Sequence, residues 1–449
     1  MIVRRGRLMT SKPSAADLRN PDYVPPMGDR IALGLQHVLA MFVSNFTPAI
    51  IIGGAAGFAF GGADAVFLIQ MSMLFAGIAT LMQTIGFGPV GARLPVMQGT
   101  SFAFIPVMIP VVKGAGIASL FGAIFVGGLF HATLGLFIGK LRHWFPPLVS
   151  GLVILVIGIE LIPVGIKYAA GGAAAFQMNN PSWGDATHWG MALVVIIVAL
   201  GLKFWAKGIL STGAVLFGLI AGYIVAIMMG QVNFAGVAKA SWFAMPVPFK
   251  YGFELNIAAI IGICLMSIVS AIETVGDISG IAKGGASREA TDKELAGGTF
   301  ADGLGTAIAG IFGGLPNTSF SQNVGLISMT GVMSRSVVTT GAIFLILCGL
   351  VPKIGAIIAA MPISVLGGGV IVMFGMVAAA GTNMLSDVVW TRRNMMILAL
   401  SLAFGLGLHL EPKALQHLPQ TAQILLASGL LPAAFLSVVL NQILPEDDH

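Results

Sequence analysis

The sequence predicts an all-α, polytopic membrane protein with fourteen transmembrane segments in two inverted sets of seven. Three observations predict this fold: the shortage of charged residues, the distribution of basic loops, and two motifs that recur about half a chain apart. Of 449 residues, 57% are hydrophobic and only 9% are charged, and the mean hydropathy is +0.94. A soluble protein carries about 25% charged residues, so lipid must be the solvent for most of this chain.

Apolar runs long enough to cross a membrane follow one another along the chain, since a membrane-spanning helix needs about 20 apolar residues. Fourteen such segments are predicted, at residues 31–53, 66–86, 96–111, 114–139, 145–165, 189–206, 210–229, 256–281, 295–314, 319–333, 337–359, 362–382, 394–409 and 421–442. Two of them, 96–111 and 319–333, are short and rich in Gly, Pro, Ser or Thr. Residues 1–30 are polar and basic, without the apolar core of a signal peptide, and are predicted to form a cytoplasmic arm.

The distribution of Lys and Arg tests this count, because cytoplasmic loops of membrane proteins carry an excess of basic residues. If the N-terminus is cytoplasmic and the fourteen segments alternate, the cytoplasmic side holds 17 of the 23 Lys and Arg residues and the outer side holds six. A wrong count would scramble this bias. We therefore predict that both termini are cytoplasmic and that the long segments 166–188 and 230–255 lie outside.

Two motifs recur at nearly the same interval. The tripeptide Thr-Ser-Phe at 100–102 returns at 318–320, 218 residues later, and Pro146 and Pro362 stand near the start of two segments 216 residues apart. Seven predicted segments separate the members of each pair, and an odd number makes the two halves inverted relative to each other. Inverted repeats with interrupted helices at matching positions are typical of secondary transporters.

Three carboxylates fall inside predicted segments. Glu273 lies in the middle of one, Asp277 follows one helical turn later on the same face, and Asp302 lies in the next segment. A charge at bilayer depth costs at least about 2.5 kcal/mol and marks a functional site by default. Two carboxylates one turn apart in a low dielectric do not both ionise readily, which suits a carrier that binds and releases protons. In the alternative interpretation, Asp277 and Asp302 only cap helices or face a water-filled crevice.

Gln322, in the second short segment, adds an amide with one acceptor oxygen and two donor hydrogens. Together with the acceptor Glu273, it suits a planar heterocycle that carries adjacent N–H donors and C=O acceptors. Phe102 and Phe320 occupy matching repeat positions and are predicted to stack on the faces of that ring. The alternative is that they are packing residues, as most of the 28 phenylalanines must be.

Other classes of function find little support in the sequence. His37 is a lone histidine in the first segment, where a structural role is favoured over a proton relay. No metal-ligand cluster and no Ser–His or Asp–Asp pair at a recognised spacing is visible, so the chain is predicted to be neither an enzyme nor a metal or cofactor protein. The basic residues are spread through short loops rather than gathered on one face, which argues against nucleic acid despite the net charge of +5.

The stretch 322–331, QNVGLISMTG, resembles the signature Q/E-N-x-G-x(4)-T-x of the nucleobase–ascorbate transporters. Gln36-His37, Glu273 and Asp302 also fit that family, and the resemblance runs from about residue 30 to 442. A Gln that opens the motif and a Gly after its Thr are similar to bacterial xanthine and urate permeases. Uracil permeases carry Glu and Arg at those two positions and His where Asp277 stands here.

The resemblance implies a core domain that holds substrate and a gate domain that commonly forms the dimer contact. Each short segment would contain a brief extended stretch, around 100–102 and 318–320, and the core would move against the gate like an elevator. Along the chain, the implied order is the cytoplasmic arm (1–30), the first half of the core with segments 1–4 (31–140), the first half of the gate with segments 5–7 (141–255), the second half of the core with segments 8–11 (256–360), and the second half of the gate with segments 12–14 and a short tail (361–449).

By the same resemblance, Glu273 and Gln322 grip the base and Phe102 stacks on it. Thr100 is closer to the urate-type pattern than to the xanthine-type pattern. The remaining predicted substrate-binding residues are Thr100, Ser321, Phe320 and Asn323. The residues predicted to couple protons or support the site are Asp302, Asp277 and His37, and Phe374 is predicted to close the gate side.

These features predict a proton-coupled importer of an oxidised purine, either xanthine or urate or both. It is expected in the inner membrane of a bacterium, as a homodimer, with the proton gradient as driving force and no cofactor. Two alternatives remain open: a uracil or other nucleobase permease, and an anion exchanger of similar architecture. The exchanger would need a positive site, and no Lys or Arg is predicted inside this one.

Overall fold

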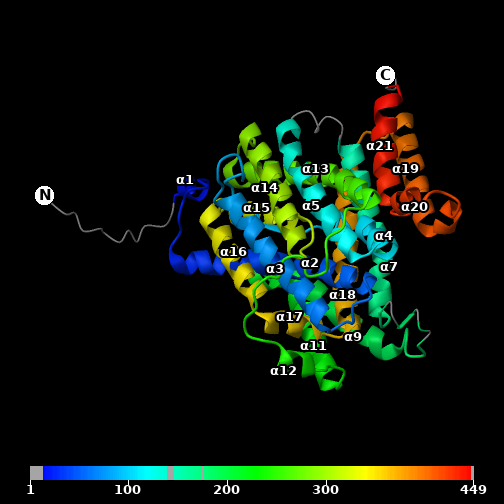
Figure 1. Cartoon of the computed structure of the whole chain (residues 1–449). Coiled ribbons are helices and arrows are strands. Elements are labelled where there is room, and N and C mark those ends of the chain that lie inside the picture. The colour runs from blue at the N-terminus through cyan, green and yellow to red at the C-terminus, as the bar shows by residue number, and fades with distance from the viewer. Residues whose placement is uncertain (1–13, 139–145, 173–174, 177, 179, 446–449) are drawn as a thin grey trace.

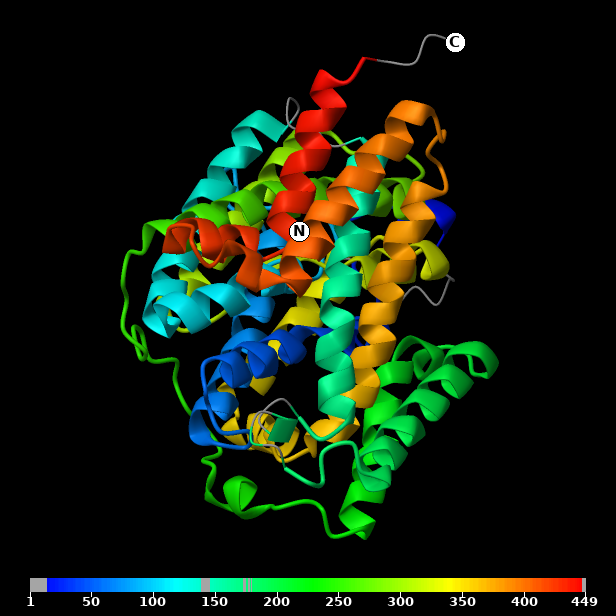
Figure 2. The same cartoon turned by 90° about the vertical axis from the view of Figure 1, so that its right-hand side faces the viewer.

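The structure, a computed structural model, describes residues 14–138, 146–172, 175, 176, 178 and 180–445. The first thirteen residues of the predicted arm lie outside the described residues, as do Lys140 and Arg142 of a predicted cytoplasmic loop. What is described is a body of packed helices with one small two-stranded sheet. Figures 1 and 2 show that this body is built from segments distant in sequence, with blue N-terminal helices beside yellow helices from the second half.

The helices have the following bounds. The first half of the chain forms α1 (Ala15–Leu18), α2 (Met27–Ala55), α3 (Ala63–Thr84), α4 (Ile105–Ala115), α5 (Ile117–Leu134), η1 (Gly135–Phe137), α7 (Pro147–Ala169), α9 (Ala186–Trp205), α10 (Ile209–Thr212), α11 (Ala214–Met228) and α12 (Ala235–Lys239). The second half forms α13 (Ile257–Ala286), α14 (Asp292–Ile311), α15 (Ser321–Thr330), α16 (Arg335–Leu350), α17 (Pro352–Ala359), α18 (Ile363–Leu385), α19 (Arg392–Leu410), η3 (Pro412–Leu415), α20 (Gln420–Leu426) and α21 (Leu430–Ile443).

Eight helices in the described ranges are long and apolar enough to cross a membrane. The count rises to ten if two bent pairs, α16 with α17 and α20 with α21, are each one span; both pairs bend by 78°. Two shorter apolar helices, α4 and α11, fall below the length of a full crossing. Each of the fourteen predicted segments overlaps a helix. A membrane-type helical fold is therefore confirmed, while the total of fourteen crossings stays a prediction.

The two short predicted segments each begin with a strand. β1 (Gln98–Thr100) pairs antiparallel with β2 (Asn317–Ser319), with Gly99 opposite Thr318. Gly99 is required at this crossing, because a Cβ there would lie 2.5 Å from the ring of Phe320 and from the methyl group of Met41. Each strand is followed by a short helix, α4 or α15, so the ends of two half-helices meet at one place inside the body.

Local sequence sets where the helices begin and how closely they pack. α14 begins at a capping box, in which the Thr291 hydroxyl accepts from Glu294 N–H and the Glu294 carboxylate accepts from Thr291 N–H. α5 and α14 pack backbone to backbone, since a Cβ on Gly128 would lie 2.4 Å from Ala307 N and one on Gly303 would lie 2.1 Å from Ala132 N. Such close approach of small residues stabilises helix pairs in lipid, where no hydrophobic effect drives them together.

Candidate substrate site

Polar side chains gather where β1 and β2 meet α13, α14 and α15. α13 and α15 run side by side in the same direction: Ser321 Oγ donates to Asp277 Oδ1 at 2.8 Å. Glycines on α13 keep the two helices close further along, where a Cβ at Gly280 would lie 2.8 Å from the side chain of Val324. The structure therefore brings the predicted carboxylates of α13 next to the signature segment of α15.

Asp302 is the most fully bonded carboxylate of the group. It is completely buried on α14. Its Oδ1 accepts from the amide of Gln83 on α3, at 2.7 Å, and from the amide of Gln98 on β1. Its Oδ2 accepts from the hydroxyl of Thr274 on α13. One carboxylate thus joins four elements, and the site support and proton coupling predicted for Asp302 stay predictions.

Asp277 bonds to the second half-helix rather than to a cap or to solvent. Its Oδ2 accepts from Ser319 Oγ at 2.6 Å, in addition to the bond from Ser321. Ser319 Oγ also lies 3.5 Å from Thr274 Oγ1, and Thr274 donates to Asp302. A continuous line of hydroxyl groups therefore connects the two aspartates through β2.

Glu273 and Gln322 differ from these neighbours. Within the described residues, neither side chain forms a hydrogen bond or an ion pair. Glu273 is partly buried, and Gln322 is exposed. Glu273 lies one helical turn before Asp277, and Gln322 lies in the first turn of α15. The two residues predicted to grip substrate are thus side chains of this junction that form no hydrogen bond with the described residues, while single oxygen atoms of Gln98, Asn317 and Asn323 also lack a partner.

Asn323 and His37, predicted from different segments, lie in contact. The Asn323 amide lies 2.9 Å from His37 Nδ1 and donates to the His37 backbone carbonyl at 2.9 Å. Both residues are buried, with 1% and 3% of their surface exposed. The contact fastens the start of α15 to α2, and the roles predicted for His37 and Asn323 stay predictions.

Thr100 and Phe320 face inward. The Thr100 N–H and hydroxyl both approach Asn45 Oδ1 of α2, at 2.8 and 3.2 Å, and the residue is 1% exposed. Phe320 is 5% exposed and packs in an apolar cluster with Met41 and Met97. In this conformation both residues are buried at the β1–β2 junction, and their contact with substrate stays a prediction.

Phe102 and Phe374 lie in contact. Their ring centroids are 5.2 Å apart and their planes are nearly perpendicular. Phe374, on α18, is fully buried, whereas Phe102 is only partly buried. The predicted stacking residue therefore touches the predicted gate residue directly.

Four residues of this junction were not singled out from the sequence: Gln83, Gln98, Thr274 and Asn45. Gln83, Gln98 and Asn45 did carry a signal, because an amide inside an apolar segment must find a partner or incur a large desolvation penalty. Thr274 carried none, since a hydroxyl can bond to its own helix. None of the three carboxylates pairs with a basic residue in the described ranges, and no group of three His, Cys, Asp or Glu residues there is placed to hold a metal.

The fold resembles that of solved membrane transporters. The transmembrane domain of a cyanobacterial bicarbonate transporter, BicA, superimposes with a TM-score of 0.56 over 92% of this chain and 96% of that domain, at 17% identity. SLC26A9 superimposes with a TM-score of 0.61 over 93% of this chain and 66% of its own, at 12% identity. At such identities the likeness shows the fold alone, which is that of a polytopic helical membrane protein.

The family follows from sequence comparison. Residues 28–414 match the model described as the permease family, so this chain belongs to that family. The uric acid transporter UacT of Escherichia coli (strain K12) is 39% identical over 433 residues, covering 94% of this chain and 87% of the relative. The xanthine permease XanQ of the same organism is 35% identical over 433 residues, covering 94% and 92%. The resemblance drawn from the signature is confirmed, and the chain is a permease rather than an enzyme.

Proposed function

We propose that this permease imports an oxidised purine, xanthine or urate or both, together with protons. One observation carries the proposal: the side chains of Glu273 and Gln322 have no protein partner among the described residues, whereas their polar neighbours Asp302, Asp277 and Asn323 each form at least one hydrogen bond. Free carboxylate and amide groups match the alternating N–H and C=O edge of an oxidised purine. Because unsatisfied polar groups are costly inside a membrane, a ligand that pairs with both is favoured.

The relatives support the choice of cargo. Those at 35–39% identity include a uric acid transporter, a uric acid permease of Bacillus subtilis, and a xanthine permease, and each aligns over more than nine tenths of this chain. Thr100, the last residue of β1, bonds to Asn45 of α2. It is the residue to substitute in order to test whether the site prefers xanthine or urate. A uracil permease is the less favoured alternative, since Gln322 and Gly331 stand where Glu and Arg are expected in that group.

Proton coupling is supported by the line of groups that joins the carboxylates. Glu273 lies one turn from Asp277, which is linked through Ser319 and Thr274 to Asp302. Carboxylates inside the membrane that lack a basic partner are the groups by which transporters carry protons. In this proposal Glu273 binds both purine and proton, Asp277 and Asp302 hold the site, and no cofactor is needed beyond the proton gradient.

Packing supports the inverted-repeat architecture that we propose. In the two proposed halves, α2, α3, α5 and α7 correspond to α13, α14, α16 and α18. α16 packs on α2 and α3, and its counterpart α5 packs in the same way on α13 and α14. α7 packs on its own counterpart, α18. The antiparallel pairing of β1 with β2 is the arrangement expected across a two-fold axis in the membrane plane. Fourteen segments in two sets of seven, both termini cytoplasmic, would follow.

We further propose that α2 to α5 with β1, together with α13 to α17 and β2, form the core domain, and that α1 belongs to the cytoplasmic arm. The main helices of the remaining segments, α7, α9, α11, α18, α19 and α21, would form the gate domain and the contact of a homodimer in the bacterial inner membrane. Alternating access would then occur by elevator-like movement of the core along the gate, past the contact between Phe102 and Phe374.

An anion exchanger is the rival from a different class, since the matching folds include a bicarbonate transporter. The residues of the site argue against it. Three carboxylates lie at the junction, and none of them pairs with a Lys or Arg in the described ranges of the chain, whereas a site for a small inorganic anion is favoured by positive charge.

Uptake of radiolabelled xanthine, urate and uracil into cells that lack their own carriers, with and without a protonophore, tests the proposal. Accumulation of xanthine or urate that the protonophore abolishes is the expected result. Accumulation of uracil alone would show that the interpretation of Gln322 and Gly331 is wrong. Anion counterflow without any effect of nucleobases would instead favour the exchanger.

A further inference from the structure

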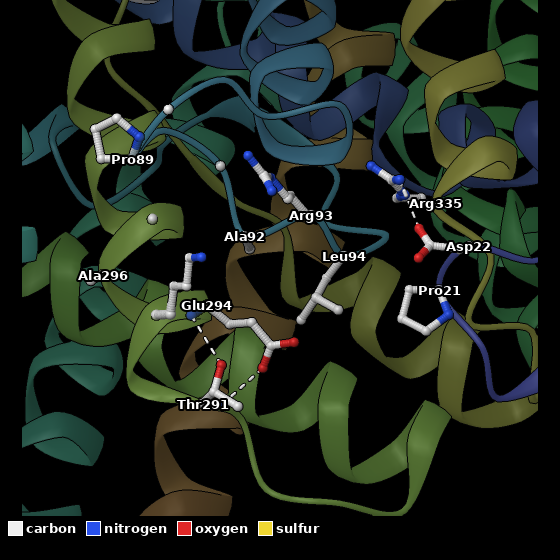
Figure 3. Close-up of a pocket in the computed structure, with 14 residues that line it drawn as sticks. Pro21, Asp22, Pro89, Ala92, Arg93, Leu94, Thr291, Glu294, Ala296 and Arg335 are labelled. Carbon is white, nitrogen blue, oxygen red and sulfur yellow. Dashed lines mark hydrogen bonds and ion pairs between the residues drawn. The ribbon is translucent and has the colours of Figure 1, made fainter.

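A cavity of about 530 Å³ opens at the end of the core domain that is predicted to face the cytoplasm, away from the purine site. It lies between the loop that joins α3 to β1, the first turn of α14 and the start of α16. Figure 3 shows Arg93 on the loop side, Asp22 paired with Arg335 at one edge, and Thr291 bonded to Glu294 at another. A cavity of this size is within the range of small-molecule sites, roughly 300–1,000 Å³.

Both carboxylates that line the cavity are ion-paired. Asp22 pairs with Arg335 at 2.7 Å, and Arg335 also donates to the Thr84 carbonyl at 3.0 Å. Glu294 accepts from both guanidinium nitrogens of Arg288, at 2.5 and 2.9 Å, and from Thr291 N–H at 2.8 Å. A cationic ligand would therefore have to compete with Arg335 and Arg288 for these two carboxylates.

Of the three basic residues that line the cavity, Arg335 is ion-paired but Arg93 and Lys293 are not. Arg93 and Lys293 are exposed, and neither forms an ion pair or a side-chain hydrogen bond with the described residues. Arg93 is nevertheless held in place: its N–H donates to the Gln83 carbonyl at 2.8 Å, and its side chain lies over Gly86, where a Cβ would come within 2.9 Å of Arg93 Cγ. A positioned guanidinium and an ammonium at one cavity make an anion the ligand that fits.

We propose that this cavity binds a phosphate-bearing anion between Arg93 and Lys293. The planar fork of arginine matches two phosphate oxygens at once, and lysine adds a point charge. The cavity exceeds what inorganic phosphate fills, so a small phosphorylated molecule or the headgroup of an anionic phospholipid is the natural occupant. The proposal goes beyond purine transport and does not depend on it.

The cavity is connected to the buried site by hydrogen bonds. The loop that carries Arg93 bonds to Gln83 a second time, through Ala92 N–H and the Gln83 side-chain oxygen at 3.1 Å. The other end of that amide donates to Asp302. Gly91 N–H donates to the Gly297 carbonyl on α14 at 2.8 Å. An anion that fastens this loop to α14 would therefore stabilise the elements that hold Asp302.

Titration calorimetry on the purified full chain in neutral detergent, at constant ionic strength, tests the proposal with three probes: inorganic phosphate, adenosine monophosphate and dihexanoyl phosphatidylglycerol. The variants are Arg93→Gly, Lys293→Gln and the pair. Arg93 has a φ of 55°, which suits glycine, so its replacement removes the cation without opposing the backbone. Lys239→Gln, an exposed lysine on the predicted outer side, is the control of equal charge change.

The expected result is saturable binding of at least one probe that each single variant weakens about tenfold, the double variant abolishes and the control leaves unchanged. Binding of the soluble phosphates identifies a free ligand, and binding of the phospholipid alone identifies a headgroup. Binding of no probe, or equal binding by the double variant, overturns the proposal. Elution as a single peak with an unchanged unfolding midpoint shows that the variants are folded.

Discussion

Phe102 and Phe374 meet edge to face, with ring centroids 5.2 Å apart, although one follows β1 and the other lies in α18. The pair is therefore a direct aromatic contact between the proposed core and gate domains. An edge-to-face pair contributes about 0.5–1.5 kcal/mol beyond the burial of its area. The contact gives the substrate-stacking residue of our proposal a neighbour that a bound purine must accommodate.

The energy of this contact is measurable by a double-mutant cycle. Phe102→Ala, Phe374→Ala and the double variant are expected to show a coupling of about 0.5–1.5 kcal/mol in the free energy of unfolding, because each single variant removes the same edge-to-face contact. Denaturant unfolding of purified protein supplies the values. A coupling near zero would mean that the two domains do not rely on this pair. Phe435→Ala, at an exposed position, is the control.

Phe102→Ala should also weaken substrate recognition. Stacking of a base on an aromatic ring is worth about 1–3 kcal/mol, so the half-saturation concentration for the purine is expected to rise about tenfold or more. Initial rates of uptake over a range of concentrations measure it. An unchanged half-saturation concentration would remove Phe102 from the site and leave it as a packing residue of the domain contact.

Glu273→Gln is expected to reduce purine accumulation to the level of cells without the carrier. The substituted amide retains hydrogen bonding but cannot gain and lose a proton through the cycle. Radiolabelled uptake driven by an imposed proton gradient is the measurement. Glu289→Gln makes the same chemical change on an exposed residue of the loop before α14 and should leave uptake intact. Normal active uptake by Glu273→Gln would rule out its role in coupling.

Asp302→Asn is expected to destabilise the fold by about 1–3 kcal/mol. Both carboxylate oxygens accept hydrogen bonds, from Gln83 and Gln98 on one side and Thr274 on the other. An asparagine keeps one acceptor oxygen for the two glutamine amides, but its NH₂ group then faces Thr274, whose hydroxyl must turn from donor to acceptor. The unfolding midpoint of purified protein measures the loss, and the exposed Asp387→Asn is the control. Equal midpoints for the two variants would contradict the bonding pattern.

Gly303→Ala is expected to separate α5 from α14, because its Cβ would lie 2.1 Å from Ala132 N. Overpacking of this kind costs about 1–3 kcal/mol, and the unfolding midpoint should fall accordingly. Gly276→Ala, in α13, meets nothing within 4 Å and should leave the midpoint unchanged or raise it. A tolerated Gly303→Ala would show that the helix pair adjusts without loss.

Several residues of the site were predictable because their chemistry is rare in lipid. Glu273, Asp277, Asp302 and Gln322 stand out in apolar segments for the reason that each needs a partner or a ligand. The support of Asp302 was not predictable in detail, since Gln83 and Gln98 reach it from elements about 200 residues away in the chain. The inward packing of Thr100 and Phe320 was equally hidden, because a motif gives residue types but not the direction of a side chain.

The sequence by itself determined that lipid surrounds most of the chain, where the segments approximately lie and to which family the chain belongs. It also identified the polar residues inside apolar segments that are expected to have a function. Each of these follows from composition or from short-range pattern, because transfer of a helix into lipid depends on its own residues. Only the tertiary structure decided that β1 crosses β2, that Asp277 bonds to Ser319, and that Phe102 rests on Phe374. Those relationships join residues distant in sequence, and they are set by close packing of backbone at glycines and by the need of every buried polar group for a partner.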